Sequence, residues 1–139
     1  MIEKVQPIAL LIARVVVGVV FFVNGWEKFA DVDGTTAYFK SAHVPFPGVS
    51  TIVIATLESV GGVALVLGLL LPVFGTLLML DMLGAIVFVH AKNGFWVSKD
   101  GYEFVMTLAA VSLALAFSGG GALAADGLWR GRKVKPDRA

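Results

Sequence analysis

Four apolar segments, separated by polar or turn-forming residues, make up most of the chain. They cover about residues 5–28, 49–71, 73–91 and 103–117, and the last reaches 123 if its helix crosses three consecutive glycines. A helix of about 20 apolar residues crosses the roughly 30 Å hydrocarbon core of a bilayer. The pattern therefore predicts an all-α fold, an integral membrane four-helix bundle.

The connection between the first two segments, residues 29–48, contains a second helical signal. Asp33-Gly34 is typical of a turn, and the threonine pair that follows can cap a short helix over 36–42. Two prolines then lead into Gly48, where that helix must already have ended. We therefore expect a short interfacial helical segment after the first span, not a fifth span.

The second and third segments are separated by little more than Pro72. Proline cannot continue the preceding helix, so the turn here must be tight and the two spans must be antiparallel neighbours. The third segment ends near His90, and a polar loop over 92–102 leads to the fourth.

One face of the first segment is unusual for a membrane span. Arg14, Gly18, Phe21, Gly25 and Lys28 recur at alternating steps of four and three, which places them on one side of a helix. An arginine that faced lipid would cost several kcal/mol, whereas glycines permit the close approach of another helix. This face is therefore predicted to pack against the rest of the chain.

Composition agrees with a membrane protein. The 139 residues are 58% hydrophobic and 15% charged, with a mean hydropathy of +0.86, whereas soluble domains carry about a quarter charged residues. We expect one four-helix transmembrane domain over 1–126 and a basic cytoplasmic tail over 127–139. The chain has no cysteine, which excludes thiol catalysis, cysteine-ligated zinc and iron–sulfur clusters on it.

Basic residues predict how the spans are oriented. With four spans, both termini lie on one side of the membrane, and the positive-inside rule places the more basic side in the cytoplasm. The C-terminal tail carries most of that charge, on Arg130, Arg132, Lys133, Lys135 and Arg138.

Three ionisable residues fall near mid-membrane. At 1.5 Å per helical residue, Arg14 and Asp81 lie roughly 14 Å from the cytoplasmic side, and Glu58 lies roughly 12 Å from the other. Charges at that depth should be paired, so we predict an inner ion pair of Arg14 with Glu58, Asp81 or both. The pair is either a structural contact or part of a proton or polar-ligand relay.

A second polar group gathers near the outer side, at the ends of three spans. Asp81 and His90 are nine positions apart, about half a turn out of phase on a straight helix, unless the helix ends early near Asn93-Gly94. The alternative to a site is a rim salt bridge between Lys28 and Glu103. The candidate polar site is an outward-opening cavity lined by Arg14, Lys28, Glu58, His90 and Glu103, with Trp26 and Tyr102 at its rim.

Other classes of site are poorly supported. The two histidines lack the ligand spacing of a zinc site, so no metal is expected. No glycine-rich phosphate loop follows a strand. The basic tail is short and better explained by membrane topology than by nucleic-acid binding.

An ordered set of motifs, from about residue 9 to 126, resembles the DoxX family. It comprises Arg14, then Gly25-Trp26-Glu27-Lys28-Phe29, Pro45 and Pro47, Glu58 with Gly61-Gly62, Gly68, His90, Gly94-Phe95 and Gly101-Tyr102-Glu103. The resemblance implies a small four-helix protein of the bacterial inner (cytoplasmic) membrane. Relatives include subunits linked to a terminal quinol oxidase or a thiosulfate:quinone oxidoreductase. Asp81 has no place in the family pattern.

The resemblance and the residues together leave three functional hypotheses. The first is an accessory subunit of a quinone-linked or oxidative-stress-related redox complex, with quinone bound non-covalently. In it Arg14, Lys28 and Glu58 orient a polar head while His90 and Glu103 move protons. The second is a non-enzymatic scaffold or assembly partner of a larger complex, in the bilayer or on it. The third is a small-molecule transporter, which the apolar inner half disfavours.

Overall fold

The computed structural model describes residues 1–130, and that part of the chain is helical with no strand. Four long helices run along its length: α1 (Ile2–Ala30), α3 (Pro47–Leu67), α4 (Leu71–Ala85) and α5 (Glu103–Phe117). The shorter elements are α2 (Val32–Ser41), the π-helix η1 (Ile86–His90), the 3₁₀ turns η2 (Ala91–Asn93) and η3 (Val97–Lys99), and α6 (Ala125–Arg130). The predicted all-α fold is confirmed.

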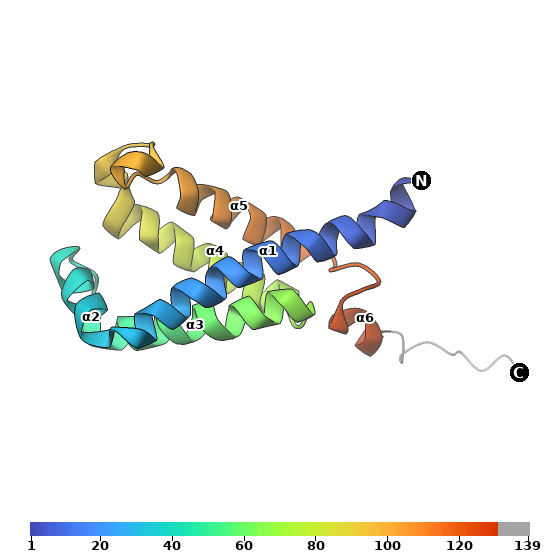
Figure 1. Cartoon of the computed structure of the whole chain (residues 1–139), viewed down its shortest axis with the longest axis horizontal. Coiled ribbons are helices and arrows are strands. Elements are labelled where there is room, and N and C mark those ends of the chain that lie inside the picture. The colour runs from blue at the N-terminus through green and yellow to red at the C-terminus, as the bar shows by residue number, and fades with distance from the viewer. Residues whose placement is uncertain (131–139) are drawn as a thin grey trace, which may run out of the picture.

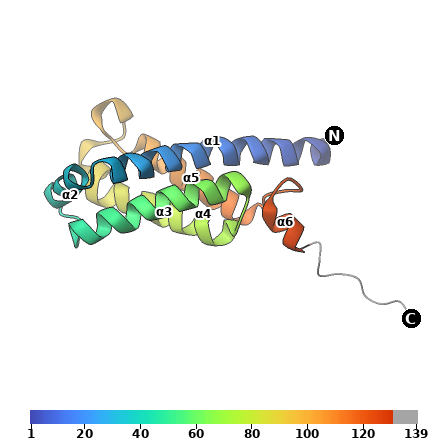
Figure 2. The same cartoon turned by 60° about the horizontal axis from the view of Figure 1, so that its bottom comes forward.

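The two ends of the bundle differ (Figures 1 and 2). We call one the loop end, formed by α2 and the segment 91–102. We call the other the terminal end, which holds the N-terminus, the α3–α4 turn and α6. The loop end corresponds to the outer side and the terminal end to the cytoplasmic side of the predicted topology.

The bundle consists of two helix pairs, α1 with α3 and α4 with α5. In the first pair, glycines lie where the two backbones approach most closely, because they have no side chain to separate the helices. A Cβ atom on Gly18 would lie 2.6 Å from the carbonyl oxygen of Gly62, and one on Gly62 would lie 2.5 Å from that of Gly18. Gly25 is equally tight against Ser59. These contacts fix the register of α1 against α3.

Substituting Gly18 with valine should destabilise the protein by about 1–3 kcal/mol, the usual cost of overpacking a close helix contact. The new side chain would have to displace the backbone of α3. The matched control is Gly84→Val, since a Cβ atom there meets nothing within 4 Å. Thermal unfolding in detergent compares the two, and equal stabilities would contradict the predicted register.

The apolar core runs along the bundle and joins the two pairs. Its most buried side chains are those of Phe21, Leu65, Leu71, Leu78 and Leu115. Glycine again allows close contact between helices, since a Cβ atom on Gly75 would lie 2.7 Å from the Ala116 Cβ. Because this core holds the pairs together, the helices can diverge toward the loop end without loss of the fold.

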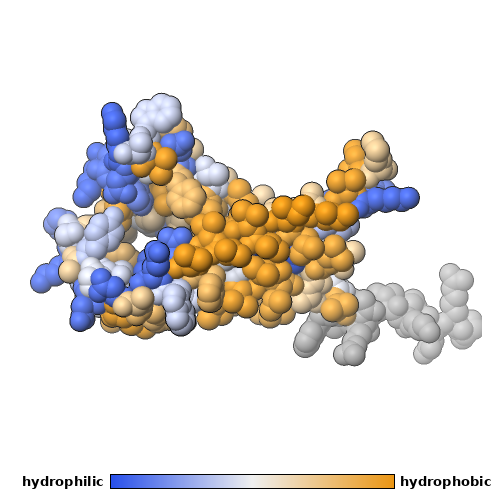
Figure 3. All heavy atoms as spheres, viewed as in Figure 1, coloured by the Kyte–Doolittle hydropathy of each residue, from blue (hydrophilic) through white to orange (hydrophobic). Residues whose placement is uncertain are grey.

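The outer surface of the bundle suits a bilayer. Figure 3 shows hydrophobic residues covering the middle of the molecule and hydrophilic residues gathered at the loop end. By length and composition, three helical stretches can cross a membrane: Ile2–Ala30, Pro47–Leu67 and Leu71–Asn93. The fourth, α5, has 15 residues and is about 22 Å long.

Helix boundaries differ from the sequence expectations in understandable ways. The short interfacial helix begins at Val32, before the predicted 36, because Asp31 caps it by accepting a hydrogen bond from the Gly34 amide at 2.9 Å. The fourth helix stops at Phe117 and does not reach 123. The next three glycines have φ values of 82°, 65° and 74°, which turn the chain out of the helix. The tail residues Arg132, Lys133, Lys135 and Arg138 lie outside the described residues.

Candidate functional site

A cavity of about 730 Å³ lies between the two helix pairs at the loop end. All four long helices contribute to its wall, together with α2 and the segment 91–102. Most of the lining is apolar, and it includes Phe21, Phe39, Phe88 and Phe104. Ligand sites in helical bundles have this form, an apolar space with a few converging polar groups.

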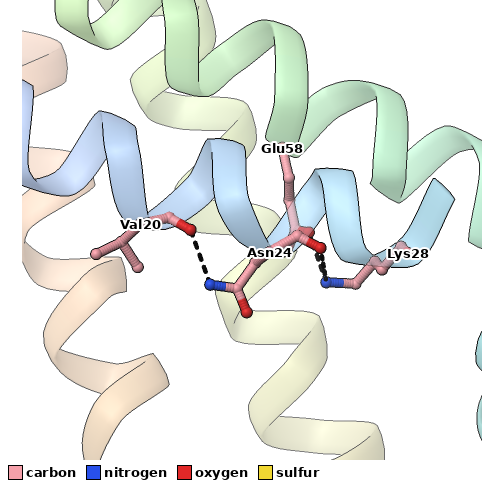
Figure 4. A network of polar contacts seen from close by, with 4 residues as sticks. All are labelled: Val20, Asn24, Lys28 and Glu58. Atoms are coloured by element: carbon pink, nitrogen blue, oxygen red, sulfur yellow. Dashed lines mark hydrogen bonds and ion pairs between the residues drawn. The ribbon is translucent and has the colours of Figure 1, made fainter. Parts of the chain in front are cut away.

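The polar end of the cavity is built on an ion pair between α1 and α3. Lys28 Nζ lies 2.6 Å from Glu58 Oε2, and Glu58 is only 3% exposed. Lys28 also donates to the Asn24 carbonyl oxygen at 3.3 Å, and Asn24 Nδ2 donates to the Val20 carbonyl oxygen at 2.7 Å. Figure 4 shows this network along α1, with Glu58 reaching down from α3.

A second carboxyl, that of Asp81 on α4, lies within hydrogen-bonding reach of Glu58. Both groups line the cavity. Asp81 Oδ2 is buried and has no hydrogen-bond partner among residues 1–130. We call Lys28, Glu58 and Asp81 the triad. It unites three different helices at one point in the apolar part of the bundle.

A π-helix brings His90 onto the same cavity as Asp81. The α4 helix changes to π geometry over Ile86–His90. A π turn holds one more residue than an α turn, so it reduces their phase difference from about half a turn to roughly a quarter. Both side chains line the cavity. The helix keeps α geometry to Ala85, and the π turn that follows rotates His90 toward the side on which Asp81 lies.

The mouth of the cavity lies between α2 and the segment 91–102. His90 Nδ1 lies 2.8 Å from the Asp100 carbonyl oxygen, which also accepts from Asn93 Nδ2 at 3.1 Å. Tyr38 faces this segment from α2. Partial burial, with the negative charge of Asp100 adding to it, raises the pKa of the Tyr38 phenol. Tyr38 is therefore a neutral hydrogen-bonding group at the mouth.

Arg14 corrects our expectation of an inner ion pair. It is fully buried, yet it contacts neither Glu58 nor Asp81: Nη2 donates to the Leu123 carbonyl oxygen at 3.0 Å, and Nη1 lies against Gly68. The register of α1 against α3 explains this. Arg14 is 14 positions from Lys28, about 21 Å along the helix, so it belongs to the terminal end.

The segment that follows α5 completes the surroundings of Arg14. After its three glycines this segment folds back over the terminal end, and the Asp126 amide donates to the Gly68 carbonyl oxygen at 3.0 Å. The Asp126 carboxylate accepts from the amides of Leu70 at 2.8 Å and Leu71 at 3.0 Å, which caps α4. We call residues 118–126 the clasp.

Comparison with known proteins decides the family. The profile of the DoxX family matches residues 9–91, more than half of the chain. The chain is a DoxX protein. A Bacillus subtilis protein named "Putative oxidoreductase CatD" is 35% identical over 116 residues, which are 84% of each chain.

Two Escherichia coli relatives of this DoxX protein carry membrane names. Inner membrane protein YphA is 30% identical over 126 residues, covering 87% of this chain and 90% of its own. Inner membrane protein YqjF is 28% identical over 131 residues, covering 91% and 95%. No solved structure matches significantly. The DoxX protein is accordingly a membrane protein.

Besides Arg14, three predicted site residues of the DoxX protein lie away from the cavity wall. Glu103 Oε2 accepts from the Val97 amide at 3.0 Å and so supports the loop, which also removes the alternative salt bridge with Lys28. Tyr102 packs edge-on against Phe95 at 5.6 Å between ring centroids. Trp26 stacks on Phe22 and is 62% exposed on the outer surface.

Other residues at the site were not predicted. Asn24 follows Phe21 by three positions and precedes Lys28 by four, so helical spacing alone could have included it. Tyr38 and Asp100 belong to segments whose folding over the mouth has no local signal. Lys28, Glu58 and His90 do line the cavity, as placed from the sequence.

Proposed function

We propose that this DoxX protein binds a quinone-like, lipid-soluble ring in its loop-end cavity and acts as an accessory subunit of a quinone-linked redox complex. The observation that supports this is the cavity itself, which combines aromatic walls with a compact polar triad. Its volume lies within the roughly 300–1,000 Å³ of typical small-molecule sites. A scaffold with a structural ion pair would need no such space.

The chemistry of the wall fits such a ring. Phenylalanine side chains can pack on its faces, while the triad meets its oxygen atoms. Leu77 and Leu80 of α4 and Phe88 of η1 line the cavity and are also exposed. A ligand dissolved in the bilayer can therefore enter from the side and leave a hydrocarbon tail in lipid.

The redox step needs a partner. Interconversion of a quinone and its quinol moves two electrons and two protons. We assign the electrons to a partner subunit that carries a redox cofactor and the protons to groups on this chain. The name of the Bacillus subtilis relative is consistent with this class of reaction. By the positive-inside rule, we assign both termini to the cytoplasm and the cavity to the outer side.

Filling the cavity from Gly84 tests this function. Gly84 lines it, and a Cβ atom there meets nothing within 4 Å, so Gly84→Leu should fold normally while occupying the ligand's space. Organic extraction of the purified protein, followed by mass spectrometry, should find quinone with the wild type and at least about tenfold less with the variant. Tenfold corresponds to about 1.4 kcal/mol of lost binding.

Gly48→Leu is the matched control, since Gly48 is exposed on α3, equally free of neighbours and outside the cavity wall. It should retain the wild-type amount of quinone. Absence of quinone from the wild type, or equal amounts in wild type and Gly84→Leu, would contradict binding in this cavity.

A further inference from the structure

The triad contains two carboxyl groups and one ammonium group. If all three were ionised, one negative charge would remain in an apolar part of the membrane. Burying an uncompensated charge costs several kcal/mol, and two carboxylates in contact also repel each other. The ionisation states of the triad are therefore linked by its geometry.

The groups that face the triad give it no second cation. From α1 it meets the Asn24 carbonyl oxygen, which accepts from Lys28, while the part of α5 that lines the cavity is apolar. At the mouth, His90 is held by Asp100, and Tyr38 is neutral. Among residues 1–130, no other lysine or arginine lines the cavity.

One proton shared between the two carboxyls accounts for the partnerless Asp81 oxygen and also removes the excess negative charge of the triad. It would give Asp81 Oδ2 the hydrogen-bond partner that residues 1–130 lack. It would also leave a single negative charge on the pair, which Lys28 balances across 2.6 Å. The triad as a whole is then neutral.

We propose that Glu58 and Asp81 share one proton and present their single negative charge to a hydroxyl group of the ligand. The inference rests on the proposed function and names the ligand class more closely, as a neutral ring bearing hydroxyl groups, such as a quinol. A cationic amine or an anionic carboxylate would leave the neutral triad with an unbalanced charge. A ring without a hydrogen-bond donor would leave the acceptor unused.

Infrared difference spectroscopy of the ligand-free protein tests the shared proton. The wild type should show the C=O stretching band of a buried, protonated carboxyl at neutral pH. Glu58→Gln and Asp81→Asn should each abolish it, because the remaining carboxylate is fully balanced by Lys28. Glu27→Gln, on the exposed side of α1, should leave the band unchanged. Absence of the band in the wild type, or its persistence in both triad variants, would overturn the sharing.

Calorimetric titration with three analogues of one ring tests the ligand class. The probes are decyl-ubiquinol, decyl-ubiquinone and the dimethyl ether of the quinol, which share size and substituents. The quinol should bind about tenfold or more tightly than the ether, which has no hydroxyl proton, and more tightly than the quinone. Equal or tighter quinone binding would overturn the hydroxyl preference and leave the proposed function standing. If no probe bound, the proposed function would fall, and the infrared experiment would still decide the shared proton.

Discussion

Replacing Lys28 with methionine should destabilise the protein by about 3 kcal/mol, because it leaves the negative charge of Glu58 and Asp81 buried without its cation. Methionine retains the apolar stem, so packing changes little. The Glu58 side chain is only 4% exposed, so water cannot easily replace the ammonium group. Thermal or denaturant unfolding of the purified protein in detergent measures the loss.

The double variant Lys28→Met, Glu58→Gln distinguishes lost charge balance from lost packing. It removes the ammonium and one carboxyl together, so it should recover most of the stability lost by the single variant. Lys40→Met is the control, since Lys40 is exposed on α2 and should tolerate the same change. A double variant no more stable than Lys28→Met would argue against the charge explanation.

Substitution of Asp126 with alanine is expected to have the second largest effect, also about 3 kcal/mol. Two backbone amides at the start of α4, those of Leu70 and Leu71, would lose their acceptor. Hydrogen bonds to a charged acceptor contribute about 1.5–3 kcal/mol each, and part of this is recovered by water at the terminal end. A negative charge that acts on Arg14 would also be lost.

The Asp126→Asn variant should fall between wild type and alanine, because an amide oxygen can still accept one hydrogen bond but carries no charge. Asp31→Ala provides a comparison at an ordinary helix cap, where the variant loses one hydrogen bond that the Asp31 side chain accepts from the Gly34 amide. That change should cost about 1 kcal/mol. Unfolding curves for all three variants would contradict the role of the clasp if Asp126→Ala cost no more than Asp31→Ala.

The sequence predicted those parts of the site that follow from periodicity. Lys28 lies on the glycine face of its helix, and Glu58 enters from the same side of the membrane, so both could be placed in the loop-end half. Arg14 shares that face, but helical spacing fixes direction and not which partner lies opposite. The glycine contacts between α1 and α3 decide the register, and they place Arg14 against Gly68.

Two other features depend on tertiary structure. The sequence identified a phase conflict between Asp81 and His90 but could not predict the π turn that reduces it. Nor could it predict that Asp126 would cap a helix 55 residues earlier, because a cap from a distant segment has no local pattern. Glu103, placed at the cavity from its position alone, instead holds the Val97 amide.

The α1/α3 pair and the α4/α5 pair are joined at the terminal end and separate toward the loop end. They can therefore move like two lever arms about that joint. The clasp and the close contact of Gly61 on α3 with Leu78 on α4 form the fulcrum, and the cavity lies between the free arms. An arm of 15 residues is about 22 Å long, so a rotation of about 5° at the fulcrum would move its tip by about 2 Å. A subunit that docks at the terminal end could therefore change the width of the cavity without touching it.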